Sequence, residues 1–242
     1  MRQYCELIDG GEHNPYHFLF YMVPNFISLD QSREIIYYYP NKKNDKISEG
    51  FLALLPANYT RHLEKDPGID YIPFQNIFPT FQDFTLPILY KFVRQLYIGS
   101  VAPQQIKERR IYIQRKAPFG RTFSNDAELQ PLLERFGYET IILENLSVKE
   151  QVRIVSEAEY IIGGHGAGLS FLVFCHPGTK LIEITGRKNS ENRHYYHMAT
   201  NMGHRYLRFQ DVVDTGNDTC SVDLQVLVRT LAEWHHPEIF SD

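Results

Sequence analysis

The second half of the chain alternates short apolar runs with longer segments that carry polar residues. Apolar runs occupy residues 110–114, 140–143 and 160–162, and a fourth closes on Glu183. Segments of helical length separate the first three runs, and an apolar segment precedes the fourth. This alternation predicts strands that are connected by helices. We therefore expect an α/β unit that has a parallel sheet with helices on both faces.

Two of the predicted helices carry end signals. Ser147 and Glu150 form the Ser-x-x-Glu pattern of a capping box, which starts a helix that runs to about residue 158. Asn125 is predicted to cap a helix that runs to about residue 136, where Gly137 provides a stop.

The first half has a weaker pattern. It predicts strands at 4–8, 34–39 and 70–73 and helices at 16–28, 51–56 and 84–97, with Pro24 kinking or ending the first helix. Residues 99–107 are polar and contain Pro103, so they are the best candidate for a boundary. We expect two α/β units, residues 1–103 and 104–242.

A glycine-rich loop follows the apolar run 160–162. Gly163, Gly164, Gly166 and Gly168 surround His165, and an apolar segment that begins with Ala167 and Leu169 comes next. A strand, a glycine loop and a helix together form an anion site, because N–H groups at a helix start are unpaired and glycine lets a ligand approach the backbone. We expect a diphosphate here.

The spacing of this loop is unusual. Its G-G-H-G-A-G pattern is neither the dinucleotide fingerprint nor the Walker loop. His165 could donate a ring N–H to a phosphate or sugar oxygen, or it could be a packed loop residue. In parallel sheets, ligands bind beyond the carboxyl ends of the strands. Loops 115–125, 143–147, 163–169 and 183–196 are therefore expected to line one crevice.

Composition narrows the class of protein. Hydrophobic residues make up 43% of the 242 residues and charged residues 22%, which is ordinary for a globular protein. The net charge of −4 gives no electrostatic reason to expect nucleic acid. Three distant cysteines argue against a disulfide framework and fit a reducing compartment. With no membrane-length apolar run or signal peptide in the sequence, we expect a soluble, cytoplasmic protein.

Charged residues occur in the predicted crevice loops. Arg115 and Arg121 flank the loop after the run 110–114, where two guanidinium groups could neutralise a diphosphate leaving group without a metal. Glu183 ends the fourth run, where a carboxylate could accept hydrogen bonds from ribose hydroxyls. The alternative is that all three are ordinary surface residues.

Histidines offer candidates for a general base. His17 begins an otherwise apolar helix, and histidine titrates near neutral pH. It could equally be a core residue, and Asp9, Glu12 and His13 compete for the role. The cluster 194–197 (His-Tyr-Tyr-His) could contact a sugar or base, or simply pack. No H-E-x-x-H, C-x-x-C or Asp-x-Asp pattern occurs, so nothing in the sequence predicts a metal site.

These motifs together resemble glycosyltransferase family 61. The resemblance rests on Arg121 with Asn125 and Asp126, the helix from Gln151 to Ala158, the segment Gly164-His165-Gly166-Ala167-Gly168-Leu169, and then Phe174, Pro177, Gly178 and Glu183. The segment Asn14-Pro15-Tyr16-His17-Phe18-Leu19 with Pro24 is similar to a short N-terminal motif of the family, with phenylalanine in place of its tryptophan. Asp126 replaces a glutamate and is left out of the site.

The resemblance implies a GT-B fold, in which two Rossmann-like domains face a cleft. It also implies an inverting, metal-independent transfer from a nucleotide sugar, usually a UDP-sugar, to a glycan or other hydroxyl acceptor. The N-terminal unit would hold the acceptor and His17 as the base. The donor-binding residues would be Arg115, Arg121, Asn125, Ser147, Gly164, His165, Gly166, Ala167, Gly168, Leu169 and Glu183. A homodimer is left open.

Two other functions are weighed against this one. A hydrolase with an oxyanion hole at residues 165–168 would need a G-x-S-x-G nucleophile elbow, which the sequence lacks. The second alternative is a nucleotide- or glycan-binding protein of the same fold that has no turnover.

Overall fold

The computed structural model describes residues 2–7, 14–40, 45–72, 87–101, 108–115, 122–186, 191–216 and 219–236. Its larger unit is built from β4 (Arg109–Ile113), α4 (Asp126–Arg135), β5 (Glu139–Ile141), η3 (Leu143–Asn145), α5 (Val148–Ser156), β6 (Ala158–Gly164), η4 (Ala167–Phe174), β7 (Lys180–Ile184), α6 (His194–Met202) and β8 (Arg205–Phe209). The five strands pair in the order β5-β4-β6-β7-β8, and all are parallel. The predicted parallel sheet is confirmed.

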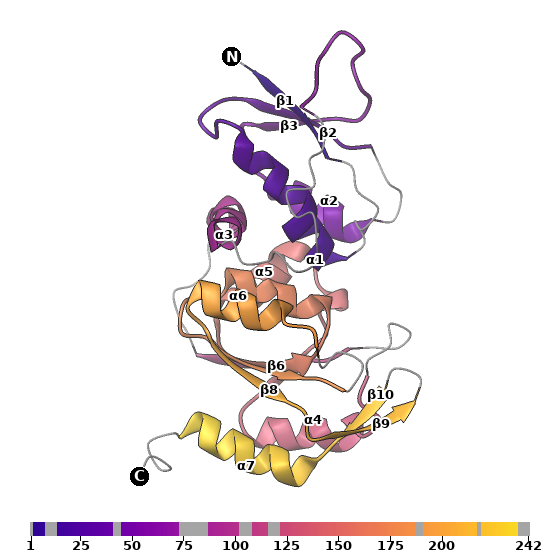
Figure 1. Cartoon of the computed structure of the whole chain (residues 1–242), viewed down its shortest axis with the longest axis vertical. Helices are drawn as coiled ribbons and strands as arrows, with labels where there is room; N and C mark the ends of the chain where they lie inside the picture. Colours follow the sequence, from indigo (N-terminus) through magenta and orange to yellow (C-terminus); the bar gives the residue numbers. More distant parts are fainter. Residues whose placement is uncertain are drawn as a thin grey trace.

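Helices cover both faces of this sheet, as the alternation predicts. In Figure 1, α5 and α6 lie on one face, while α4 and α7 (Leu224–His235) lie on the other. Side chains alternate between the faces: Ile111 and Ile161 belong to the first core, and Tyr112, Tyr160 and Ile162 belong to the second. This period of two is what a sheet buried on both faces requires.

The N-terminal half forms a second, smaller parallel sheet. It comprises β1 (Gln3–Glu6), α1 (Pro15–His17), η1 (Phe18–Met22), η2 (Val23–Ser28), β2 (Ile35–Tyr38), α2 (Lys46–Leu52), β3 (Tyr59–His62) and α3 (Pro87–Val101). The strand order is β1-β2-β3. The expected helix at 16–28 is three consecutive helical segments that change from α- through π- to 3₁₀-geometry, with Pro24 in the last.

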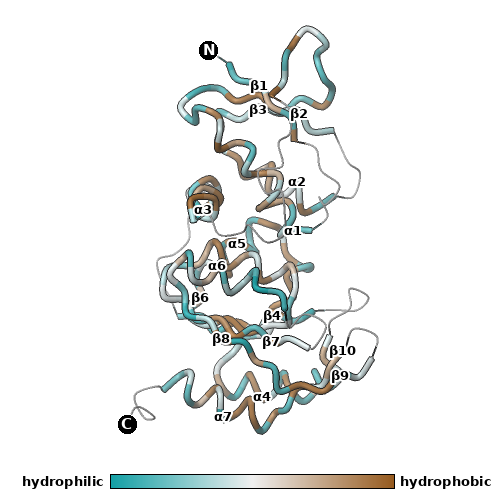
Figure 2. The backbone as a smooth tube through the Cα atoms, viewed as in Figure 1, coloured by the Kyte–Doolittle hydropathy of each residue, from teal (hydrophilic) through white to brown (hydrophobic). Residues whose placement is uncertain are grey.

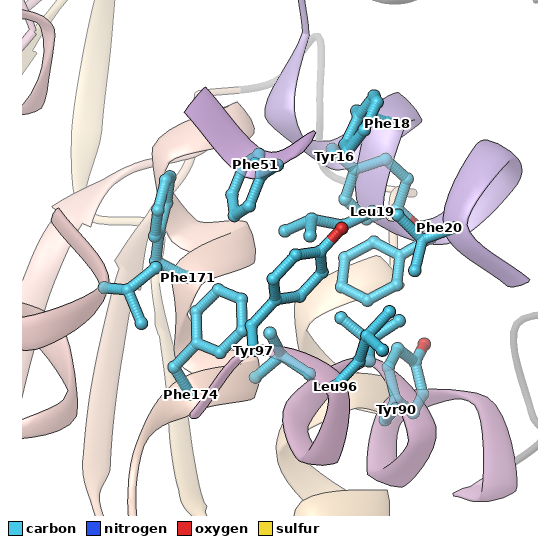
Figure 3. Packing of buried hydrophobic residues seen from close by; sticks show 14 of the residues in the cluster. Tyr16, Phe18, Leu19, Phe20, Phe51, Tyr90, Leu96, Tyr97, Phe171 and Phe174 are labelled. Carbon is cyan, nitrogen blue, oxygen red and sulfur yellow. The ribbon is translucent and has the colours of Figure 1, made fainter. Parts of the chain in front are cut away.

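One aromatic core joins the two halves (Figure 3). The ring of Phe51 on α2 stacks on Phe18 at 5.6 Å between centroids and on Phe171 of η4 at 5.8 Å. Tyr97 of α3 contacts Phe174 at 6.3 Å. Because residues on both sides of the predicted boundary pack into one core, the N-terminal elements are fixed relative to the larger sheet.

Several predictions for single elements are wrong. The helix predicted at 51–56 is instead α2, which begins earlier because the side chain of Asp45 accepts from the Ser48 N–H. The strand predicted at 70–73 is a single bridge between Ile72 and Cys5. Three further features were not predicted from the sequence: β3, α6 and the hairpin formed by β9 (Val212–Gly216) and β10 (Thr219–Val222).

Hydropathy follows this architecture. Figure 2 shows hydrophobic stretches along the strands of the larger sheet, whereas hydrophilic stretches lie on the outer turns of helices and loops. Within the described residues, no helix has both the length and the apolar character needed to span a membrane.

His235 at the end of α7 makes stability depend on pH. Its Nδ1 lies 3.3 Å from Arg110 Nη1 and its Nε2 lies 3.0 Å from the Tyr138 hydroxyl. Burial, and then the Arg110 charge, lower the pKa of His235 to about 4. Since arginine only donates, Nδ1 must accept, which requires a neutral imidazole.

We therefore expect the free energy of unfolding to fall as the pH drops from about 6.5 towards 4, because the unfolded chain then binds a proton that the folded chain excludes. The contribution of His235 should be about 1–2 kcal/mol after solvent screening. Urea unfolding at pH 7.5 and 4.5 measures it. The His235→Phe variant should lose less stability between these two pH values than the wild type; an equal loss would contradict this account.

Candidate functional site

The order of the large sheet defines where a ligand should bind. The chain leaves β4 for β5 on one side and returns to β6 on the other, so the loops after β4 and β6 diverge from a single point. In doubly wound sheets, ligands bind in the crevice that this switch of direction opens. The structure has a pocket of about 290 Å³ at this point. The larger unit lines it with Ile113, Gln114, Arg115, Leu143, Glu144, Gln151, Ala167, Gly168 and Phe171, and the N-terminal half with Asn14, Pro15 and Ile47.

The glycines at the end of β6 and in the loop that follows it have little room for a side chain. A Cβ on Gly163 would lie 3.3 Å from Ile113, and a Cβ on Gly168 would lie 3.2 Å from Leu143. A Cβ on Gly166 would overlap the guanidinium of Arg115. None of these three has the positive backbone angle that favours glycine. Close approach of neighbouring groups, not backbone conformation, is therefore the reason for glycine.

Arg115 lies directly on this loop. Its Nη1 donates to the carbonyl oxygen of His165 at 3.1 Å, and its side chain fills the space that Gly166 leaves. The segment after the loop, η4, is a 3₁₀-helix that starts at Ala167, not the expected α-helix. Its first N–H groups lack partners within the helix, so the guanidinium and these N–H groups can bind one anion.

His165 has a buried carboxylate partner. Its Nδ1 is hydrogen-bonded to Glu183 Oε1, and the Tyr206 hydroxyl donates to Glu183 Oε2. Glu183 is fully buried and His165 is 7% exposed. Arg208 Nη2 lies 3.9 Å from the same carboxylate. Glu183 is therefore placed to orient His165 and is not a surface residue, whereas its contact with ribose hydroxyls stays a prediction.

Residues of α6 and α1 close the other side of the loop. The Tyr195 hydroxyl donates to the carbonyl oxygen of Gly166 at 2.6 Å, and its ring contacts that of His165 at 5.4 Å. The ring of His194 lies 5.2 Å from Tyr16. The cluster at 194–197 thus packs against both the glycine loop and α1.

Histidines gather at this position. The pKa of His194 is lowered to about 4, first because burial desolvates it and then because His165 lies close to it. His197 and His17 act in the same direction, and Glu183 opposes them. His17 itself is half-buried, with its ring 5.1 Å from Tyr21. His17 follows Tyr16, whose ring contacts those of His194 and Tyr195, so the candidate base lies beside α6 and its role stays a prediction.

Other predicted site residues have structural contacts. Asn125 does not cap α4: its amide donates to the Val222 carbonyl oxygen and accepts from the Val222 N–H, both at 2.9 Å. Ser147 forms the predicted capping box with Glu150. These contacts hold the fold, and a role of Asn125 and Ser147 in donor binding stays a prediction.

The remaining predicted residues are placed as follows. Gly164 ends β6, where it pairs with Ile184. Leu169 is buried, and its N–H donates to the Gly166 carbonyl oxygen at 2.9 Å. Arg121 lies outside the described residues, as do Asp9, Glu12 and His13.

Two pocket residues, Gln151 and Glu144, were not among the predicted donor-binding residues, although Gln151 belongs to a motif of the resemblance and Glu144 to the predicted crevice loop 143–147. Gln151 is 2% exposed on the first turns of α5. Glu144 is exposed and follows β5, the strand after which nucleotide folds place the acidic residue that binds ribose. The position of Glu144 after the second predicted strand was a signal available in the sequence. In the part of the chain that the structure covers, no group of three or more His, Cys, Asp or Glu residues is placed to hold a metal ion.

Comparison with known proteins agrees with these motifs. The sequence profile of the family Glycosyltransferase 61 matches residues 16–182. The EGF domain-specific O-linked N-acetylglucosamine transferase of Drosophila melanogaster is 27% identical over 190 residues, which are 77% of this chain and 32% of that protein. Beta-1,2-xylosyltransferases of Oryza sativa subsp. japonica and Arabidopsis thaliana are each 46% identical over 43 residues, which are 18% of this chain and 8% of each enzyme.

The aligned part is thus a third or less of the length of each relative. The family profile, in contrast, covers more than half of this chain, from α1 through the glycine loop to β7. The chain belongs to glycosyltransferase family 61.

Proposed function

We propose that the chain transfers a sugar from a nucleotide sugar, with uridine diphosphate as the leaving group, to a hydroxyl of a glycan or other acceptor. The observation that carries this proposal is the pocket at the sheet's change of direction, where Arg115 and the start of η4 lie beside the buried His165–Glu183 pair. A positive side chain and unpaired N–H groups are suited to a diphosphate.

The parts of the donor are assigned along the edge of the sheet. The base would lie beside Leu143, and the ribose hydroxyls would donate to Glu144. The diphosphate would contact the side chain of Arg115 and the backbone N–H groups of Ala167 and Gly168. These three residues line the pocket. The transferred sugar would then lie towards His165. The base, ribose, diphosphate and sugar would thus lie in turn along the edge of the sheet, in the direction from β5 through β4 and β6 to β7.

The chemistry we propose is a single displacement that inverts the anomeric carbon. A base, with His17 as the candidate, takes the proton of the acceptor hydroxyl, whose oxygen attacks the anomeric carbon while the bond to the diphosphate breaks. The departing diphosphate is stabilised by Arg115 and the first N–H groups of η4, while Glu183 fixes the ring of His165 beside them. We propose that this occurs without a bound metal, because the Arg115 guanidinium supplies the positive charge.

The N-terminal half would complete the site. Asn14, Pro15 and Ile47 line the pocket opposite the glycine loop. This arrangement favours a GT-B-like organisation in which the N-terminal unit holds the acceptor and the larger unit holds the donor.

Measuring donor consumption with and without an acceptor tests this function. We expect release of uridine diphosphate from a UDP-sugar to rise when a hydroxyl acceptor is added, to persist with a chelator present, and to yield a product of inverted anomeric configuration by NMR. GDP- and CMP-sugars are the comparison donors. If a nucleotide sugar raises the melting temperature but is never consumed, the chain is a binding protein and the proposed transfer is wrong.

A further inference from the structure

Gln151 is a buried polar side chain on the wall of the pocket. It lies on α5 with 2% of its surface exposed, and it lines the 290 Å³ pocket beside Leu143. A buried amide in a largely apolar wall is costly unless its polar atoms have partners. The hydrogen bonds of Gln151 therefore show which of its polar atoms is left to bind a ligand.

Two backbone carbonyls fix the orientation of this amide. Gln151 Nε2 donates to the Leu143 carbonyl oxygen at 2.8 Å and to the Leu146 carbonyl oxygen at 3.0 Å. Carbonyl oxygens only accept, so the NH₂ group must face them and the flipped amide would place oxygen against oxygen. Both hydrogens of Nε2 are used. The side-chain hydrogen bonds of Gln151 among the described residues both come from Nε2, so Oε1 is the polar atom that Gln151 can present to the pocket.

The neighbouring side chains favour a flat apolar ligand. Ile113, Leu143, Ile47 and Phe171 contribute aliphatic and aromatic surface to the same pocket. Arg115 lies at its edge on the side of the glycine loop. A nucleobase between the apolar side chains would therefore have its diphosphate next to the guanidinium.

We propose that Gln151 selects the base of the donor, in an inference that rests on the proposed function. Its Oε1 accepts a hydrogen bond from a ring N–H, and only a lactam ring has one on this edge: N3–H of uracil or N1–H of guanine. Cytosine carries a lone pair at N3, so an acceptor would face an acceptor. Sites built to hydrogen-bond one group reject analogues that lack it, because their own polar atom is left unpaired.

Binding of nucleotides to the wild-type protein is the first test. By calorimetry, uridine diphosphate should bind about tenfold or more tightly than cytidine diphosphate, which is the size expected for one hydrogen bond in a desolvated pocket. Uridine diphosphate methylated at N3 should bind at least as weakly as cytidine diphosphate, because it has no N3–H to donate. If uridine and cytidine diphosphates bind equally, the inference about Gln151 is wrong while the proposed function stands.

The Gln151→Met variant separates selection from packing. Methionine keeps the side-chain length but has no amide, so the preference for uridine over cytidine diphosphate should fall to about twofold or less. A mere distortion of η3 would weaken both nucleotides and leave their ratio unchanged, which would contradict a direct contact. The same substitution at Gln130 on α4, which bonds Glu134 away from the pocket, is the matched control and should leave the ratio unchanged.

Calorimetry with guanosine diphosphate distinguishes between the two lactam bases, uracil and guanine. If guanosine diphosphate binds more tightly than uridine diphosphate, the role of Gln151 in selecting the base is supported. The proposed function would then be wrong about uridine as the nucleoside of the donor. If the folded protein binds none of these nucleotides, the proposed function fails and the inference fails with it.

Discussion

Replacing Glu183 by glutamine should lower kcat about a hundredfold or more. The carboxylate accepts from both His165 and Tyr206, whereas a glutamine has one accepting oxygen, so one of these two donors would face an NH₂ group that cannot accept. Residues that orient a functional histidine contribute effects of this size when they are changed to an amide. Steady-state kinetics with a UDP-sugar and calorimetry with uridine diphosphate measure the result. Affinity for the nucleotide should change by less than about threefold, because Arg115 stays in place.

A double variant shows whether Glu183 acts through His165. If it does, His165→Ala/Glu183→Gln should be no slower than His165→Ala alone, since groups that act as a unit are not additive. Tyr206→Phe is the control, because it removes the other hydrogen bond to the carboxylate and leaves the His165 contact intact. Additive losses in the double variant would show that Glu183 affects the rate by another route. Each protein should be assayed well below its melting temperature, because the buried change costs about 1–3 kcal/mol.

The Gly166→Ala variant is expected to lose diphosphate binding about as completely as Arg115→Ala. The added Cβ would occupy the position of the Arg115 guanidinium and displace it from the glycine loop. Loss of the charge-assisted hydrogen bonds to the diphosphate should lower the affinity for uridine diphosphate about tenfold to a hundredfold. Calorimetry with the single and double variants measures this.

The two changes should not add, because both remove one contact. The double variant should bind as weakly as Arg115→Ala and no more weakly. Gly99→Ala on α3 is the matched control: no atom lies within 4 Å of its added Cβ, so it should bind normally. Normal nucleotide binding by Gly166→Ala would mean that Arg115 does not hold the diphosphate.

The larger sheet was predictable from the sequence because its strands and helices differ clearly in length and polarity. The order of the strands in the sheet was not predictable, because it depends on the face of the sheet on which each connecting segment passes. The helix α6 was missed although Tyr195, Met198, Ala199 and Met202 follow its buried face at helical spacing. Their polar and aromatic neighbours obscured this period, which a count of apolar positions would have found.

The site was predictable where a local motif defines it. The glycine loop and Arg115 do lie together, because both follow neighbouring parallel strands. The geometry of Glu183 was not predictable, because its burial depends on α6 and on Tyr206 of the next strand. Gln151 belonged to a motif of the resemblance, but its hydrogen bonds to the backbone of η3 appear only in three dimensions.

A crystal structure of the chain with bound uridine diphosphate tests the central claim most directly. We predict the uracil beside Gln151 and Leu143, with the diphosphate on Arg115 and the first N–H groups of η4. Nucleotide bound elsewhere, such as in the groove between α4 and α7 that Leu132 and Val228 line, with this pocket empty, would contradict the account.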